Sequence, residues 1–140
     1  MAANEILVGA SREQVWAVLA DAERYADWVV GAQEVRDADD AYPAEGSALH
    51  HRSGIGPLTL DDETRVLEQR PGELLILRAK LRPLGEVEVR FSLHEADGGT
   101  RLEMEEEPVA GALTMLPGAD LALAARNALI LQRLKTLAEG

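Results

Sequence analysis

Two polar residues, His51 and Asp62, lie in segments whose alternating polarity predicts β-strands with one apolar face. In the segment 46–55, His51 shares its face with Leu49, whereas His50 lies on the opposite face. A histidine on an apolar face could donate a hydrogen bond to a ligand carbonyl, or act as an acid or base near neutral pH. The alternative is a rim position at which His51 is exposed to solvent.

Asp62 belongs to an acidic cluster, Asp61-Asp62-Glu63, and alternation places it on the same face as Leu60 and Val66. An inward carboxylate would have a raised pKa and could serve as a general base. A solvated twist or bulge in the strand would account for the same residues without any chemistry.

A third candidate, Asn127, lies in the segment from Asp120 to Glu139, where apolar residues recur at helical spacing. The spacing defines a stripe that excludes Arg126, Arg133 and Lys135 and comprises Leu116, Asp120, Leu123, Asn127, Ile130, Leu134 and Leu137. An amide among aliphatic neighbours costs free energy unless something forms a hydrogen bond with it. That partner could be a ligand, a trapped water or a strand backbone.

Two other residues of this stripe belong to the candidate site. Leu123, about one helical turn before Asn127, is a candidate apolar contact for a ligand. Asp120 is a candidate polar contact, but it lies near the start of the predicted helix. An acid there is also favoured by capping and by the helix dipole, without any function.

Several kinds of site are not expected in this chain. It has no cysteine, so disulfides, thiolate catalysis and zinc-thiolate sites are excluded. His50 and His51 point to opposite faces of a strand and cannot bind one metal ion together. The sequence has no glycine-rich phosphate loop, dinucleotide fingerprint or nucleophile elbow. We therefore predict that no metal, nucleotide or flavin cofactor accompanies the protein.

The composition is that of one globular domain. The chain has 140 residues, of which 46% are hydrophobic and 28% charged, and we expect them to form a single domain over 1–140. A net charge of −11 repels phosphate backbones, so no nucleic-acid partner is expected. Neither a secretion signal nor an apolar run of membrane-spanning length is present. The expected location is therefore cytoplasmic, without integral membrane association.

The candidate residues must be positioned by short strands and by helices. A strand is predicted from Asn4 to Gly9, and a capping box of Ser11 and Gln14 predicts a helix that begins at about Arg12. Asp21 then caps a second short helix. From residue 33 onward, short alternating segments are separated by turns at 37–46, 54–57, 70–72, 82–85 and 97–99. This order predicts an α+β fold with an antiparallel sheet of six or seven strands.

The alternation also predicts which face of the sheet is apolar. Apolar residues occupy every second position in two of the segments, namely Leu75, Leu77, Ala79 and Leu81 in one and Val87, Val89, Phe91 and Leu93 in the other. The intervening residues, Ile76 among them, are predicted to face solvent. An apolar face needs a cover, and the only long element left is the helix from Asp120 to Ala138. We expect this helix to pack across the concave face of the sheet.

The order of these elements, and short runs of residues along nearly the whole chain, resemble the START-like superfamily, which includes polyketide cyclases and dehydrases. The runs are Ser11-Arg12-Glu13-Gln14-Val15-Trp16, Val18-Leu19-Ala20-Asp21, Glu23-Arg24-Tyr25-Ala26-Asp27-Trp28, Gly46-Ser47, Glu68-Gln69-Arg70-Pro71, Leu75-Ile76-Leu77, Gly98-Gly99-Thr100-Arg101-Leu102, and Arg126-Asn127 with Leu131, Leu134 and Lys135. The resemblance implies a helix-grip fold, in which a curved sheet wraps around a long helix and encloses a cavity. It carries no universal catalytic residue.

The resemblance also implies a place for two aromatic residues, Tyr25 and Trp28, where related proteins narrow the mouth of the cavity. Aromatic side chains there can stack on a planar ligand, and the alternative is plain core or rim packing. Aromatic residues make up only 4% of the chain. Cavity walls of Leu, Val, Ile and Ala would therefore favour a lipid-like or alicyclic ligand over one with many stacked rings.

Three functions are compatible with such a domain. The first is a non-catalytic carrier or sensor of a hydrophobic small molecule, lipid-like, quinone-like or polyketide-like, which needs only the cavity. The second is an enzyme of the aromatic polyketide cyclase or dehydratase kind, in which the pocket folds a reactive chain and polar groups move protons. The third is a regulatory module that binds a partner protein through its surface.

Overall fold

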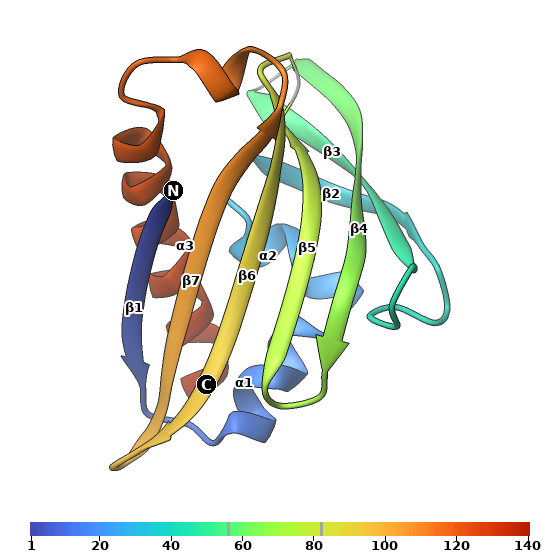
Figure 1. The fold of residues 1–140 in the computed structure, drawn as a ribbon. Coiled ribbons are helices and arrows are strands. Elements are labelled where there is room, and N and C mark those ends of the chain that lie inside the picture. Colours follow the sequence, from blue (N-terminus) through green and yellow to red (C-terminus); the bar gives the residue numbers. More distant parts are fainter. Residues whose placement is uncertain (56, 82) are drawn as a thin grey trace.

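The computed structural model describes residues 1–55, 57–81 and 83–140, and its elements follow the order that the sequence predicts (Figure 1). Seven strands run in chain order: β1 (Ala2–Val8), β2 (Ala32–Ala38), β3 (Ala48–Ile55), β4 (Leu58–Arg70), β5 (Leu74–Leu81), β6 (Gly85–Ala96) and β7 (Gly99–Ala110). The helices are α1 (Arg12–Leu19), η1 (Ala22–Arg24), α2 (Tyr25–Trp28), η2 (Ala112–Met115) and α3 (Ala119–Glu139). Gly56 and Arg82, which the sequence assigns to two of the turns, lie outside the described residues.

The seven strands form one antiparallel sheet in the order β1-β7-β6-β5-β4-β3-β2. From β2 to β7 each strand pairs with the next along the chain, as expected for a meander whose breaks are short turns. The first strand then pairs with the last, from Ala2 opposite Glu106 to Val8 opposite Thr100. This pairing sets the bounds of β1, which begins two residues earlier than predicted and ends one residue earlier.

The hairpin between β6 and β7 depends on two adjacent glycines with different roles. Gly98 has a φ of +80°, a conformation that residues with a Cβ rarely adopt. At Gly99 an added Cβ would lie only 1.9 Å from the carbonyl oxygen of Val8, so no larger residue fits without a backbone shift. The Oγ1 of the neighbouring Thr100 donates a buried hydrogen bond to the carbonyl of Ala10 at 2.8 Å. This corner attaches the end of β1 to the last hairpin.

The predicted helix starts are confirmed. Ser11 and Gln14 form the capping box: the Gln14 amide donates to Ser11 Oγ at 3.1 Å, and the Ser11 amide donates to Gln14 Oε1 at 2.8 Å. Asp21 Oδ1 accepts a hydrogen bond from the Glu23 amide and caps η1, after which the chain continues directly into α2. These caps fix the point at which the chain leaves β1, and α2 carries Tyr25 to the concave side of the sheet.

One face of the sheet is less exposed than the alternation predicts. Ile76 is buried although it belongs to the outward set of β5. Its partners in register are Glu68 on β4 and Arg90 on β6, whose long side chains can cover apolar surface with their aliphatic parts. The prediction that this position faces solvent is therefore wrong.

The long helix α3 packs on the concave side, with contacts to β1, β7, α1 and α2 (Figure 1). Its buried residues are Leu123, Asn127, Ile130, Leu131 and Leu134, which confirms most of the predicted stripe. Leu116 does not belong to it, because η2 and the turn at Pro117 and Gly118 come between β7 and the helix, and Leu116 is exposed there.

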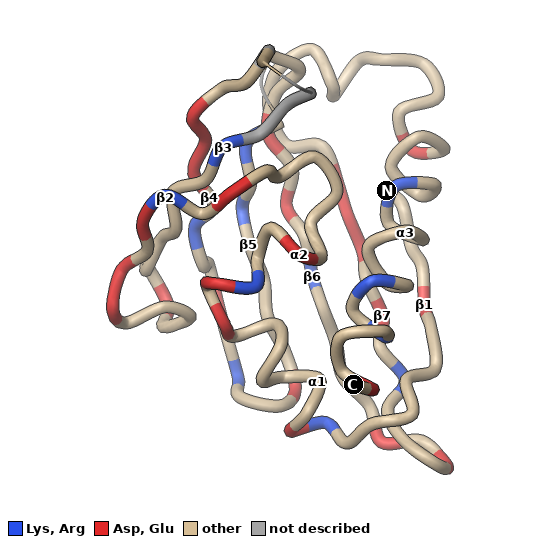
Figure 2. The backbone as a smooth tube through the Cα atoms, turned by 180° about the vertical axis from the view of Figure 1, so that it is seen from behind, with Lys and Arg blue, Asp and Glu red and all other residues tan. Residues whose placement is uncertain are grey.

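Charged residues are spread over the whole fold. Acidic residues occur on strands, helices and loops alike, with basic residues among them (Figure 2). In the described ranges, no helix combines the length and the apolar character needed to cross a membrane.

Candidate functional site

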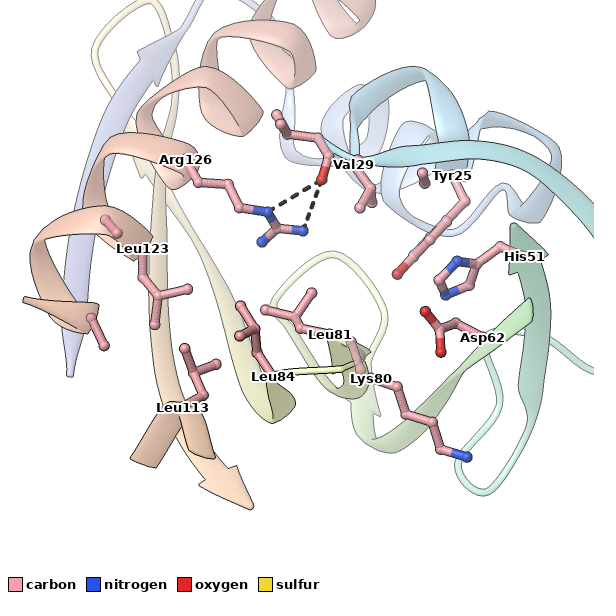
Figure 3. Close-up of a pocket in the computed structure, with 16 residues that line it drawn as sticks. Tyr25, Val29, His51, Asp62, Lys80, Leu81, Leu84, Leu113, Leu123 and Arg126 are labelled. Carbon is pink, nitrogen blue, oxygen red and sulfur yellow. Dashed lines mark hydrogen bonds between the residues drawn. The ribbon is translucent and has the colours of Figure 1, made fainter. Parts of the chain in front are cut away.

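A cavity of about 330 Å³ lies between α3, the α2–β2 connection and the strands β3 to β5 (Figure 3). Its walls are mainly aliphatic. The apolar lining residues are Val29, Val30, Ala32, Ala79, Leu81, Leu84, Leu113, Ala119, Ala122 and Leu123. Polar side chains reach it from opposite sides: Tyr25, His51 and Asp62 at one end, and Arg126 at the other. An apolar space with a few polar groups is the usual form of a small-molecule site.

Neighbouring strands bring His51 and Asp62 together. The two residues are directly opposite one another in the antiparallel register of β3 and β4, so their side chains leave the same face of the sheet. Tyr25 approaches from α2, and its ring centroid lies 5.0 Å from that of His51. Thr64, two residues after Asp62 on β4, completes this polar cluster of Tyr25, His51, Asp62 and Thr64.

Hydrogen bonds connect three members of the polar cluster. The hydroxyls of Tyr25 and Thr64 are 2.6 Å apart, and Thr64 Oγ1 lies 3.0 Å from His51 Nε2. All three side chains are buried. Because either hydroxyl can donate, the direction of the chain depends on which nitrogen of His51 carries the proton. The arrangement could pass a proton between Tyr25 and His51 through Thr64.

Burial determines the charge of the two titratable side chains that these hydrogen bonds connect, His51 and Tyr25. It lowers the pKa of His51 to about 4; the Asp62 carboxylate opposes this shift, and Arg36 and His50 add to it. Burial likewise raises the pKa of Tyr25 to about 12, against the hydrogen bond from Thr64 and the charge of Arg126. At neutral pH His51 is therefore a neutral imidazole and Tyr25 a neutral phenol. A neutral imidazole can accept a proton from a bound molecule.

The sequence offered two alternatives for His51 and two for Asp62, and the structure decides between them. His51 is only 2% exposed, so the solvent-exposed rim position is wrong and the inward position holds. Asp62 is buried on the same face as Val66, as alternation predicts. Leu60, on that face by the same alternation, is 43% exposed, because it lies near the start of β4.

Arg126 forms the opposite end of the cavity and, as predicted, is not part of the buried stripe of α3. Its Nε and Nη2 donate to the carbonyl oxygen of Val30 at 3.2 and 3.1 Å (Figure 3). Its Nη1 lies 3.4 Å from Oε2 of Glu106, a buried residue of β7. Arg126 is on the flank of α3, and the helical stripe alone gives no sign that the chain after α2 covers this flank.

Residues 2–139 match the model of a protein family described as polyketide cyclase / dehydrase and lipid transport. The chain belongs to this family. A comparison with curated protein sequences gives no significant match.

Solved structures share the fold of this family member at low sequence identity. Protein CV1439 from Chromobacterium violaceum is 18% identical with a TM-score of 0.79, covering 99% of this chain and 96% of that one. Ara h 8.0201 is 10% identical with a TM-score of 0.77, covering 97% and 95%. The di-domain ARO/CYC BexL from the BE-7585A biosynthetic pathway is 17% identical with a TM-score of 0.72, covering 99% of this chain and 49% of BexL. These likenesses confirm the helix-grip fold.

In this polyketide cyclase / dehydrase family member, the other ligand-binding residues that the sequence predicts lie at different distances from the cavity. Leu123 lines the cavity. Trp28 is buried behind it, with its ring edge against Phe91 and Tyr25, and does not line the main cavity. Asp120 lies at the surface in the first turn of α3, where its carboxylate accepts a hydrogen bond from the N-terminal ammonium at 2.8 Å. That contact and the helix dipole account for Asp120 without a ligand.

Asn127 is fully buried but does not line the main cavity. It lies beside Glu106 and lowers the pKa of that carboxyl, yet the contact falls outside hydrogen-bond geometry. Within the described residues, neither polar atom of the Asn127 amide has a hydrogen-bond partner. The amide therefore does not hold the helix to a strand backbone, which was one of the alternatives from the sequence.

At about pH 4, where a Glu106 carboxyl of raised pKa is protonated and does not need the Asn127 contact, replacing Asn127 with Leu is expected to raise the free energy of unfolding by about 1 kcal/mol. An unsatisfied buried amide then gives way to an apolar side chain of similar size. Thermal unfolding measures the change. Asn4→Leu is the control and should not raise stability, since the Asn4 amide nitrogen donates to the carbonyl of Ala124 at 3.1 Å and its loss offsets the removal of the unpartnered Oδ1. A stability loss in Asn127→Leu would show that the amide has a partner.

Sequence reasoning did not select Glu106, although the same alternation contains the signal. Leu102, Met104 and Glu106 occupy every second position of β7 and are all buried. The three consecutive glutamates at 105–107 are typical of a solvated strand end, and for this reason the pattern did not single out Glu106 as the inward residue. Thr64 likewise follows Asp62 by two positions and shares its face.

Proposed function

We propose that this protein binds a hydrophobic small molecule in the cavity between α3 and the sheet, as a carrier or sensor. The observation that supports the proposal is the lining of the cavity, where ten apolar residues surround a space with buried polar groups at one end and the half-buried Arg126 at the other. Aliphatic walls of this kind suit a lipid-like, quinone-like or alicyclic molecule. Membership of a family described by cyclisation, dehydration and lipid transport is consistent with it.

A fluorescent apolar probe, N-phenylnaphthylamine, tests the proposal with two matched variants of α3. Both alanines are exposed on α3 and tolerate a larger residue without repacking the core, but only Ala122 lines the cavity. Ala122→Phe should weaken probe binding about tenfold, which corresponds to about 1.4 kcal/mol, because the ring occupies part of the cavity. Ala125→Phe should leave the affinity within about twofold. Equal affinity in both variants, or no binding to the wild type, would contradict the proposal.

The second candidate function is cyclisation or dehydration of a polyketide-like chain, and the hydrogen-bonded polar cluster favours it. A neutral His51 beside Asp62 could remove a proton next to a ketone, while the Tyr25 hydroxyl could donate to the developing oxyanion. In an aldol closure the enolate carbon then forms a C–C bond to a second carbonyl carbon, whose oxygen takes up a proton and becomes a hydroxyl. Loss of that hydroxyl together with a proton from the neighbouring carbon releases water and leaves a C=C bond in the ring. The similar proteins BexL and StfQ are both described as ARO/CYC di-domain proteins of biosynthetic pathways.

The two functions differ in what His51 does. A short linear polyketone that can condense with itself, losing one water, should react faster with the wild-type protein if the site is catalytic. His51→Phe should then abolish the acceleration while the fluorescent probe still binds. A carrier would bind the polyketone without changing its rate of condensation.

A further inference from the structure

A second, smaller compartment adjoins the main cavity, deeper between the sheet and α3. Its volume is about 20 Å³, which is room for one water-sized group. Tyr25, Val29, Ala79 and Arg126 line both spaces, so these four residues form the boundary between them. The compartment is also lined by buried core residues such as Phe91. The two spaces are therefore adjacent and share one wall.

Two polar groups of the compartment lining have no partner. Trp28 and Glu106 both line it, and in the part of the chain that the structure describes neither Trp28 Nε1 nor Glu106 Oε1 forms a hydrogen bond. Both atoms are buried, and Glu106 as a whole is 1% exposed. The indole nitrogen can only donate, whereas a carboxyl oxygen can accept and, when protonated, donate. Buried groups of this kind almost always have a partner, so the lining indicates a place for one more polar atom.

The charges around the compartment restrict which atom this can be. Glu106 Oε2 already contacts Arg126 Nη1, at 3.4 Å, so Oε1 is the carboxyl oxygen that lacks a partner. Burial raises the pKa of Glu106, against the opposing effects of Arg126 and Asn127, so the site does not favour additional charge. An anionic group would be repelled by an ionised Glu106, and a cationic one by Arg126. A neutral oxygen suits both.

We infer that the compartment binds one neutral oxygen of the ligand, a hydroxyl or a carbonyl, with Trp28 Nε1 donating to it and the Glu106 carboxyl as its second partner. The inference rests on the proposed function, because it places the polar end of a molecule held in the main cavity. The ligand class is then an alcohol or ketone on an apolar frame. Fatty acids and amines fit the compartment less well.

The experiment compares β-naphthol with naphthalene, two probes that differ by one hydroxyl, in titration calorimetry. The wild-type protein should bind β-naphthol about tenfold more tightly than naphthalene. Glu106→Leu and Trp28→Phe should each reduce the affinity for β-naphthol about five- to tenfold and change that for naphthalene by less than about twofold. Glu107→Gln, at the exposed neighbouring position of β7, is the control and should leave both affinities unchanged.

The binding results distinguish a failure of the inference about the inner compartment from a failure of the proposed ligand-binding function. If both probes bind and the preference for β-naphthol survives in Glu106→Leu and Trp28→Phe, or is lost in His51→Phe, the inner compartment is not the polar anchor and the inference is overturned. If neither probe binds the wild-type protein, the proposed function itself has failed.

A measurement on the unaltered chain covers the case in which a variant does not fold. The protein has two tryptophans, Trp16 and Trp28, and each gives one indole N–H resonance. β-Naphthol should shift the Trp28 resonance downfield, whereas naphthalene should not, and Trp16 should respond to neither. A Trp28 resonance that is the same with both probes would overturn the inference.

Discussion

Leu134→Asp is expected to unfold the domain, or to lower its free energy of unfolding by about 5 kcal/mol. Leu134 is 1% exposed on the face of α3 that packs into the core, so the substitution buries a carboxylate without a partner and removes apolar contact area. Chemical denaturation followed by circular dichroism measures the change. A loss of this size exceeds a third of the stability of most domains.

A matched substitution on the same helix controls for the charge itself. Leu129 is 57% exposed, and Leu129→Asp should change the free energy of unfolding by less than about 0.5 kcal/mol. A folded Leu134→Asp with unchanged stability, or two variants that lose the same amount, would show that α3 does not pack on the sheet through this stripe.

Arg126→Met should destabilise the protein by about 3 kcal/mol, because it leaves the buried Glu106 carboxylate without its cation. In the Glu106→Gln background the same change should cost only about 1 kcal/mol, the loss of the hydrogen bonds to the Val30 carbonyl. The difference, about 2 kcal/mol, is the coupling between the two side chains, and a double-mutant cycle of denaturation midpoints measures it.

The coupling should depend on pH with a definite sign. Glu106 has a higher pKa in the folded than in the unfolded state, so the folded protein keeps a proton that the unfolded chain releases. The stability that this proton on Glu106 contributes is therefore fully present below the ordinary carboxyl pKa. It is lost as the pH rises through the raised pKa of Glu106 in the folded state. Removing Arg126 raises the folded pKa further and deepens this loss at neutral pH. At about pH 4 both states are largely protonated and the coupling should become small; a pH-independent coupling would contradict the assignment.

Much of the architecture could be predicted from the sequence because it depends on local chemistry. The capping box at Ser11, the cap at Asp21 and the glycines at the last hairpin act within a few residues, and all lie where the pattern places them. Strand alternation correctly placed His51 on the face of Leu49 and Asp62 on that of Val66, because successive residues of a strand point to opposite sides in any fold, but it left their exposure to solvent open. Helical spacing likewise identified Leu123, Asn127 and Leu134 as buried.

The composition of the site was decided only by the tertiary structure. The spacing of apolar residues indicates which face of a strand or helix a residue occupies, but not what covers that face. Ile76 is buried between the side chains of neighbouring strands. Arg126 turns inward because the chain after α2 passes over the flank of α3. The polar cluster joins residues 39 positions apart, Tyr25 and Thr64, which no local pattern relates. Glu106 and Trp28 line a shared compartment because β7 and α2 both pack against α3. Burial fixes the neutral state of His51 in the same way, because desolvation depends on every element around the side chain.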